Sequence, residues 1–226
     1  MSRMFKSITK TWDVFVGCLF DCSYCNARKA ALTRFKHLAR YKDGFKPHLV
    51  ESELDRKFKP GEFIFVTYMG DIAFASIEEI YLILDRIKQF PETRFLIQTK
   101  CPAIFKGWGF LFPPNVYLGT TLETDKPHSF SEAPIPEVRA KWLAHFPHPH
   151  KFVSIEPIMD FEPKYFLYMI ENIKPEIIEV GADNYHNHLP EPNPFKLDFL
   201  LTALRTICPT VIEKSGLERL KEGGLT

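Results

Sequence analysis

Short hydrophobic runs, rich in β-branched and aromatic residues, recur along the chain between longer polar stretches. Runs of this length and composition are typical of strands buried in a sheet. They predict six strands and a weaker seventh candidate. The six lie at residues 14–16, 63–68, 95–98, 116–121, 152–155 and 177–180, and the weaker candidate is at Val211 and Ile212.

Helical spacing of apolar residues fills the intervals between these runs. The clearest helix is predicted at 77–90, where Ser76 and Glu79 have the S-x-x-E spacing of a capping box. Pro136 and Pro163 stand where the first residue of a helix is expected. The other predicted helices cover residues 27–42, 136–146, 163–173 and 197–207.

Strands and helices therefore alternate, which indicates right-handed βαβ units and a parallel sheet covered by helices. The chain has 226 residues, fewer than the roughly 250 of a complete eight-unit barrel. The pattern predicts an α/β fold, a TIM-like partial (β/α)6 barrel. Because no linker stands out, we expect a single domain over residues 1–226.

Polar residues follow each predicted strand, at the edge of the sheet where parallel α/β folds bind their ligands. These residues are the cysteine-rich stretch 17–25, then Met69-Gly70-Asp71, Thr99-Lys100, 120–125, Glu156-Pro157 and 181–184. We expect them to form one functional rim.

Net charge and the distribution of apolar residues indicate which partners and which location to expect. The formal net charge is +1, so the overall charge gives no argument for a polyanionic partner. No run of eighteen apolar residues is present, which argues against a membrane span. The N-terminus also lacks the apolar stretch of a secretory signal. We therefore expect a cytoplasmic protein that does not associate with membranes.

Three of the five cysteines lie close together, in what we call the Cys loop (residues 17–25). Cys18, Cys22 and Cys25 have the spacing C-x3-C-x2-C. Such clustering indicates a metal or redox centre rather than a disulfide framework. A [4Fe-4S] cluster normally has four thiolate ligands, so three thiolates would leave one iron open to another ligand.

This spacing, with Tyr24 before the last cysteine, resembles the radical S-adenosylmethionine (SAM) superfamily. Tyr68-Met69-Gly70-Asp71 resembles a variant of its Gly-Gly-Glu motif, with Met in place of the first Gly and Asp in place of Glu. Further pieces resemble a phage-type radical SAM group that is loosely similar to spore photoproduct lyase. These are Thr11-Trp12-Asp13, Gln98-Thr99-Lys100, Leu118-Gly119 with Glu123, and Ser154-Ile155-Glu156-Pro157.

The resemblance implies a [4Fe-4S] cluster on Cys18, Cys22 and Cys25 that reductively cleaves SAM to a 5′-deoxyadenosyl radical, which abstracts hydrogen from an unidentified substrate. An electron donor such as a flavodoxin or ferredoxin would supply the electron. The residues implied to contact SAM are Tyr24, Gly70, Asp71, Lys100, Thr120, Thr121, Glu123, Ser154 and Glu156.

Simpler interpretations stay open for several of these residues. The three cysteines could bind structural zinc together with a His such as His37. Glu123 and Glu156 could be solvated loop carboxylates or helix caps. Cys101 and Cys208 each stand alone beside a Pro and are expected to be ordinary buried thiols.

A local basic segment (residues 28–46) follows the Cys loop. It contains Arg28, Lys29, Arg34, Lys36, Arg40, Lys42 and Lys46 against a single acid, Asp43, with Phe35, Tyr41 and Phe45 between them. This mixture suits phosphate contacts and base stacking, although a solvated helix face has the same composition. The alternative function is therefore a non-catalytic zinc or Fe–S module that binds nucleic acid.

Overall fold

The computed structural model describes residues 5–108 and 112–221, which fall into two compact units. The first unit comprises residues 8–117 and 130–133, and the second comprises residues 1–7, 118–129 and 134–226. The expectation of a single domain stays a prediction.

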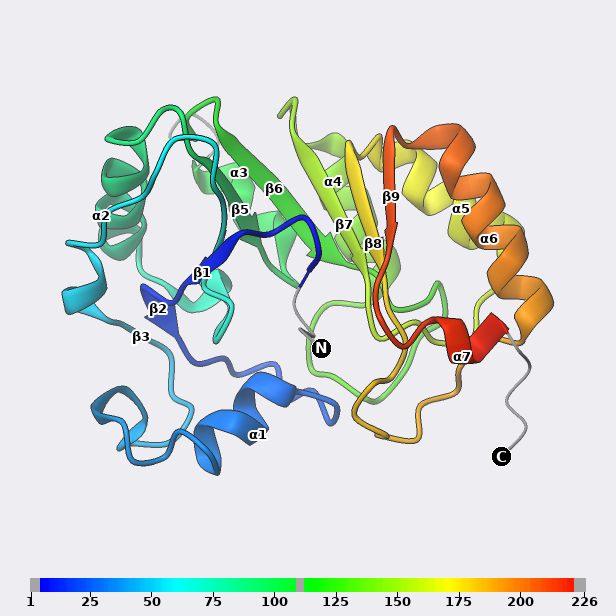
Figure 1. The fold of residues 1–226 in the computed structure, drawn as a ribbon, viewed down its shortest axis with the longest axis horizontal. Helices are drawn as coiled ribbons and strands as arrows, with labels where there is room; N and C mark the ends of the chain where they lie inside the picture. The colour runs from blue at the N-terminus through cyan, green and yellow to red at the C-terminus, as the bar shows by residue number, and fades with distance from the viewer. Residues whose placement is uncertain (1–4, 109–111, 222–226) are drawn as a thin grey trace. The chain divides into compact units, whose positions relative to one another are not determined.

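The main sheet contains seven strands among the described residues. Their pairings are parallel within both units, which confirms the predicted α/β partial barrel of parallel strands covered by helices (Figure 1). The seventh strand contains the weaker candidate, Val211 and Ile212. In sheet order the strands are β1 (Lys10–Trp12), β4 (Phe63–Val66), β5 (Arg94–Gln98), β6 (Val116–Thr121), β7 (Lys151–Ile155), β8 (Ile177–Val180) and β9 (Thr210–Glu213).

The first unit contains three α-helices among the described residues: α1 (Asn26–Leu32), α2 (Ile77–Lys88) and α3 (Phe105–Trp108). Short 3-10 helices cover Ala39–Tyr41, Glu51–Glu53, Ile72–Phe74 and Pro102–Ile104. The predicted capping box is confirmed, because Glu79 N donates to Ser76 Oγ at 3.2 Å and Ser76 N donates to Glu79 Oε2 at 2.7 Å. Helix α2 buries Ile80, Ile83, Leu84 and Ile87.

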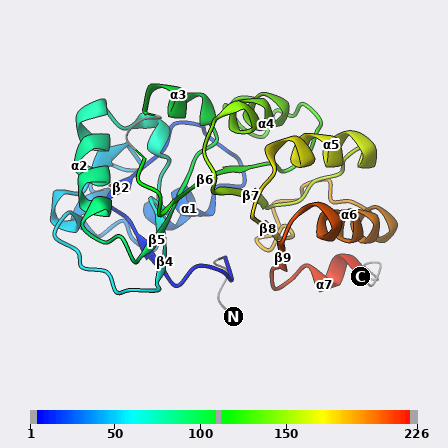
Figure 2. The same ribbon diagram turned by 90° about the horizontal axis from the view of Figure 1, so that it is seen from above.

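In the second unit, three long helices lie side by side along one face of the strands (Figures 1 and 2). They are α4 (Pro136–His145), α5 (Pro163–Ile173) and α6 (Pro194–Ile207), and the short α7 (Glu218–Lys221) follows β9. Each long helix begins with a Pro, whose fixed φ and missing N–H suit a first turn. Strands β7 and β8 are buried along their whole length, as expected when helices cover a parallel sheet.

The first strand lies elsewhere than predicted. Residues 10–12 form β1 of the main sheet, whereas Phe15–Val16 (β2) pairs antiparallel with His48–Leu49 (β3) in a separate ribbon. The sequence pattern favours the more apolar run, because Lys10 and Thr11 are polar. The Lys10 ammonium forms an ion pair with Glu62, so a charged residue is tolerated at the start of this strand.

The helix after the Cys loop is also shorter than the predicted range 27–42, and it ends at Leu32. Thr33 closes it, because both its backbone N–H and its hydroxyl donate to the Lys29 carbonyl, the hydroxyl at 2.6 Å. A Thr hydroxyl that competes for a helical carbonyl weakens the following turn. The rest of the basic segment therefore consists of turns and the 3-10 helix Ala39–Tyr41.

No helix in the described part of the chain is both long enough and apolar enough to cross a membrane.

The Cys loop is attached to the sheet by two glycines in close approach. Gly17 and Gly70 form an isolated parallel bridge, in which Gly17 N donates to the Met69 carbonyl and Asp71 N donates to the Gly17 carbonyl. A Cβ added at Gly70 would lie 2.9 Å from the backbone N and O of Gly17. The loop can therefore lie this close only if residue 70 has no side chain.

We predict that Gly70→Ala lowers the free energy of unfolding by about 1–3 kcal/mol, because the methyl group forces these backbones apart. Gly107→Ala is the matched control, since Gly107 belongs to α3 and its added Cβ would have no close contact with other segments among the described residues. It should leave stability unchanged or raise it by up to about 1 kcal/mol. Urea denaturation measures both variants. A Gly70→Ala protein as stable as the wild type would contradict this explanation of the close approach.

Candidate active site

Backbone hydrogen bonds to two distant segments, in addition to the segment that carries Gly70, hold the Cys loop in the first unit. Cys18 N donates to the Phe45 carbonyl at 3.3 Å, on the side of the basic segment. On the other side, Ser23 N donates to the Phe130 carbonyl at 2.9 Å, and Glu132 N donates to the Phe20 carbonyl at 2.7 Å. The segment 130–133 therefore acts as a strap across the loop. These bonds all involve the main chain of the loop.

The three cysteine side chains lie in partly apolar surroundings. Cys22 is buried, and Cys18 and Cys25 are partly buried. Cys18 and Cys25 pack against a cluster that includes Val16, Ala31, Tyr41, Phe45, Val50 and Met69. Burial raises the pKa of the Cys18 and Cys25 thiols. Without a metal these thiols are protonated at neutral pH, so cluster binding would have to displace their protons.

Local backbone donors point at two of the sulfurs. Phe20 N donates to Cys18 Sγ at 3.4 Å, and Arg28 N donates to Cys25 Sγ at 3.3 Å, which makes Cys25 the N-cap of α1. Hydrogen bonds from N–H groups to sulfur are among the interactions that tune protein-bound iron–sulfur clusters. The loop therefore has the donor arrangement that suits thiolate ligands.

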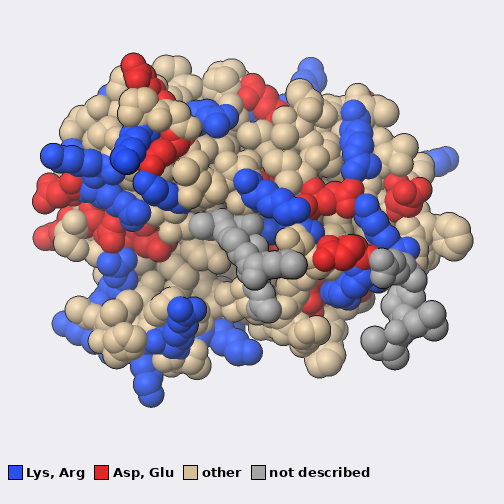
Figure 3. Space-filling model, in the orientation of Figure 1, with Lys and Arg blue, Asp and Glu red and all other residues tan. Residues whose placement is uncertain are grey.

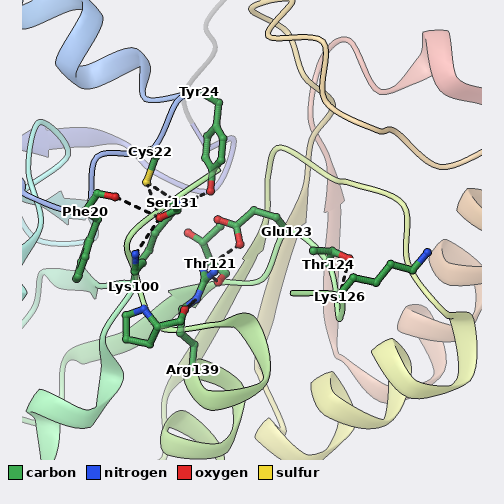
Figure 4. A network of polar contacts seen from close by, with 12 residues as sticks. Phe20, Cys22, Tyr24, Lys100, Thr121, Glu123, Thr124, Lys126, Ser131 and Arg139 are labelled. Carbon is green, nitrogen blue, oxygen red and sulfur yellow. Dashed lines mark hydrogen bonds and ion pairs between the residues drawn. The ribbon is translucent and has the colours of Figure 1, made fainter. Parts of the chain in front are cut away.

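Side chains from two other parts of the first unit reach Cys22 (Figure 4). Lys100 Nζ lies 3.6 Å from Cys22 Sγ and donates to the Tyr24 hydroxyl at 2.6 Å. The Lys100 ammonium also lies 4.5 Å from the centre of the Tyr24 ring. Ser131 Oγ lies 3.1 Å from Cys22 Sγ. The structure thus brings Lys100 to the middle cysteine and to Tyr24; the predicted contacts of Lys100 and Tyr24 with SAM stay predictions.

Asp71 is buried and holds the residues that follow β5. Its carboxylate accepts bonds from Thr99 Oγ1 at 2.6 Å, Lys100 N at 2.9 Å and Ala73 N at 2.9 Å. Burial raises the pKa of Asp71, and the hydrogen bond from Thr99 opposes that shift. Asp71 therefore fixes the backbone of Lys100, and its predicted contact with SAM stays a prediction.

In the second unit, Glu123 forms an ion pair with Arg139 that is closed to solvent (Figure 4). Arg139 Nη1 donates to Glu123 Oε2 at 2.9 Å, and both side chains are 0% exposed. The same guanidinium donates to the carbonyls of Thr121 at 2.6 Å and Pro134 at 2.7 Å. Its Nη2 atom is buried without a hydrogen-bond partner among the described residues. Glu123 is thus neither a solvated loop carboxylate nor a helix cap.

Sequence reasoning missed Arg139, although a signal was present. Helix α4 buries Pro136, Arg139, Ala140 and Leu143, which share one face at helical spacing. A charged residue on the apolar face of a helix requires a buried partner. Ser131 carried no such signal, because it lies in a Pro-rich loop 109 residues from Cys22.

The remaining predicted residues of the second unit lie at the ends of β6 and β7. Thr120, Thr121 and Ser154 are buried, and Thr121 is the register partner of Ser154. Glu156 forms an ion pair with Lys214, whose side chain is 4% exposed. Burial raises the pKa of Glu156, and Lys214 opposes that shift. Lys214, which directly follows β9, was not predicted from sequence.

The two isolated cysteines have ordinary surroundings. Cys208 is buried, and its thiol donates to the Thr210 carbonyl at 3.3 Å. Cys101 is partly buried and precedes the 3-10 helix Pro102–Ile104. Both arrangements are compatible with structural thiols.

The donor set of the Cys loop suits an iron–sulfur cluster. A cubane places each thiolate on its own iron, and one loop carries the three cysteines. N–H and ammonium groups lie within hydrogen-bond distance of their sulfurs, as is common around protein-bound clusters.

We predict that Arg139→Met lowers the free energy of unfolding by about 3–5 kcal/mol, because it leaves the Glu123 carboxylate buried without its counter-ion. The double variant Arg139→Met/Glu123→Gln should recover part of this loss. Lys141→Met, at an exposed position of the same helix, is the control and should change stability by less than about 0.5 kcal/mol. Urea denaturation measures the stability of all three variants. If Arg139→Met were as stable as Lys141→Met, the buried ion pair would not have the stabilising role described here.

Comparison with known proteins supports the predicted fold. A search of curated proteins finds no match to the sequence. Three solved structures of spore photoproduct lyase are similar, and each comparison covers 93% of this chain and 78% of the other. A cysteine mutant with dinucleoside spore photoproduct has a TM-score of 0.63 at 9% identity. A tyrosine mutant has a TM-score of 0.62 at 8% identity. A double mutant with bound AdoMet and dinucleoside spore photoproduct has a TM-score of 0.59 at 8% identity.

The fold is therefore similar to that of spore photoproduct lyase, as the sequence resemblance predicted. A family model described as "Protein of unknown function (DUF5131)" matches residues 4–175, more than half of the chain, and the chain belongs to this family.

Proposed function

We propose that this protein is a radical SAM enzyme that binds a [4Fe-4S] cluster through Cys18, Cys22 and Cys25. The observation that carries the proposal is the Cys loop. Its main chain is hydrogen-bonded to Phe45 and to the segment 130–133. N–H, ammonium and hydroxyl groups lie within hydrogen-bond distance of its sulfurs. The similarity in fold to a protein solved with bound AdoMet supports the same chemistry.

A bound cluster would supply one electron to the sulfonium of SAM, whose C–S bond breaks to give methionine and a 5′-deoxyadenosyl radical that abstracts hydrogen from substrate. A flavodoxin or ferredoxin is the proposed electron donor. In the first unit, we propose that Tyr24 lies near the adenine and that the backbone beside Gly70 receives the methionine amino group. Burial of Tyr24 beside the Lys100 ammonium already fixes its ring.

In the second unit, Thr120, Thr121, Glu123, Ser154 and Glu156 are the proposed SAM contacts. Glu156 is the most accessible acid among them, because Glu123 is fully buried. Gly181 lies against it, since an added Cβ would lie 2.7 Å from Glu156 Oε1. Glu156 could accept two bonds from a pair of hydroxyl groups, while Glu123 and Arg139 hold the backbone that follows β6.

We predict that the anaerobically reconstituted protein binds about four irons and four sulfides, since three thiolates leave one iron of a [4Fe-4S] cluster open. Cys22→Ala should abolish the cluster, whereas Cys208→Ala, which removes a thiol outside the loop, should retain it. Iron and sulfide analysis with UV–visible spectra measures this. Stoichiometric zinc without iron would instead support the non-catalytic alternative.

We further propose that the basic segment contacts the phosphates of a nucleic-acid substrate. Lys29, Arg34, Lys36, Lys42 and Lys46 are exposed, and basic side chains gather on this part of the surface (Figure 3). Arg28 and Arg40 are instead paired with Asp21 and Glu53. The segment packs on the same core as Cys18 and Cys25, and one similar solved structure holds a dinucleoside.

We predict that binding to a labelled oligonucleotide weakens steeply with salt, because each neutralised phosphate releases condensed counterions. Lys36→Glu/Lys42→Glu should lower the salt slope by about two on duplex DNA and leave the cluster spectrum unchanged. Lys57→Glu/Lys106→Glu, at exposed positions outside the segment, is the matched control. Equal binding by both double variants would mean that the basic segment is only a solvated face.

A further inference from the structure

We infer that Lys100 and Ser131 set the reduction potential of the cluster by donating to the sulfur of Cys22. Both side chains lie in the same unit as the Cys loop, with Nζ at 3.6 Å and Oγ at 3.1 Å from Cys22 Sγ. The inference rests on the proposed function, because it concerns the thiolate that would bind iron. It differs from the sequence-based prediction that Lys100 pairs with the SAM carboxylate.

The surroundings of Cys22 differ in kind from those of its neighbours. The sulfurs of Cys18 and Cys25 accept bonds from the backbone N–H groups of Phe20 and Arg28, two and three residues later in the chain. The local turn supplies these donors. Cys22 receives side chains from residues 78 and 109 positions away. A local turn could not supply these two groups. They are at Cys22 because the fold brings residues 100 and 131 there and because these residues are Lys and Ser.

The rest of the first unit holds both donors in place. Ser131 Oγ accepts a bond from Ala133 N at 3.1 Å, and its hydroxyl can donate to the Phe20 carbonyl at 3.5 Å or to Cys22 Sγ at 3.1 Å. A Cys22 thiolate is the nearer acceptor and carries the greater negative charge, so the hydroxyl hydrogen would turn toward the sulfur. The strap that carries Ser131 is itself bonded to the backbone of Phe20 and Ser23. Asp71 accepts a bond from Lys100 N, and the Tyr24 hydroxyl accepts one from Lys100 Nζ. Asp71 and Tyr24 are therefore positioning residues for Lys100.

A positive charge and a hydroxyl donor at a thiolate favour the reduced state of a cluster, because reduction adds a negative charge. Outer-shell donors of this kind tune metal sites in proteins. Lys100 and Ser131 should therefore raise the midpoint potential, so that a given electron donor reduces the cluster more completely.

The test is a redox titration of the anaerobically reconstituted full-length protein without SAM, followed by EPR of the reduced cluster. Lys100→Met should make the midpoint potential more negative. At a fixed potential, the ratio of oxidised to reduced cluster should rise by at least about tenfold, which corresponds to about 59 mV for one electron. Ser131→Ala should shift the midpoint potential in the same direction by less. Lys100→Arg keeps the positive charge, so its midpoint potential should lie between those of Lys100→Met and the wild type.

Two matched controls remove the same chemical groups elsewhere in this unit. Lys106→Met removes a positive charge from an exposed site, and Ser52→Ala removes an exposed hydroxyl from the 3-10 helix Glu51–Glu53. Both should keep the wild-type potential. If Lys100→Met failed to bind iron, the Ser131→Ala shift would decide alone.

The inference is overturned if Lys100→Met and Ser131→Ala both bind the cluster at the wild-type potential. It is also overturned if Lys100→Met weakens SAM binding while the potential in the absence of SAM stays unchanged, because Lys100 would then act on the SAM carboxylate. A wild-type protein that binds no cluster would be a different result, since the proposed function itself would then fail.

Discussion

The contact between the backbones of Gly17 and Gly70 determines where the cysteines of the first unit can be. Two main-chain hydrogen bonds and the absence of any side chain at residue 70 let the Cys loop lie directly against the end of β4. The strap at 130–133 holds the loop from the other side. Because backbone atoms fix the loop, the cysteine side chains are left available as ligands.

Buried, hydrogen-bonded polar groups hold the chain that follows the strands in each unit. In the first unit, Asp71 accepts three bonds and so fixes the backbone that carries Lys100. In the second unit, Arg139 neutralises Glu123 and holds the Thr121 carbonyl. Replacing one member of such a set leaves the others desolvated and unpaired, which is far more costly than losing an exposed ion pair.

The sequence pattern predicted the buried strands, the long helices and the Cys loop, because period, capping and spacing are local signals. It misplaced the first strand, since Lys10 at the edge of the sheet is compensated by Glu62, far along the chain. Arg139 could have been found on the apolar face of α4. Ser131 and Lys214 could not, because their roles depend on which distant segments the fold brings together.

These features together describe a fold that presents three thiols and surrounds one of them, Cys22, with groups that stabilise negative charge. We propose that a cluster bound to this loop keeps one iron free for SAM. EPR spectra of the reconstituted and reduced protein, recorded with and without SAM, decide this. We expect SAM to change the spectrum and 5′-deoxyadenosine to form as the signal decays. An identical spectrum in both samples, without 5′-deoxyadenosine, would contradict it.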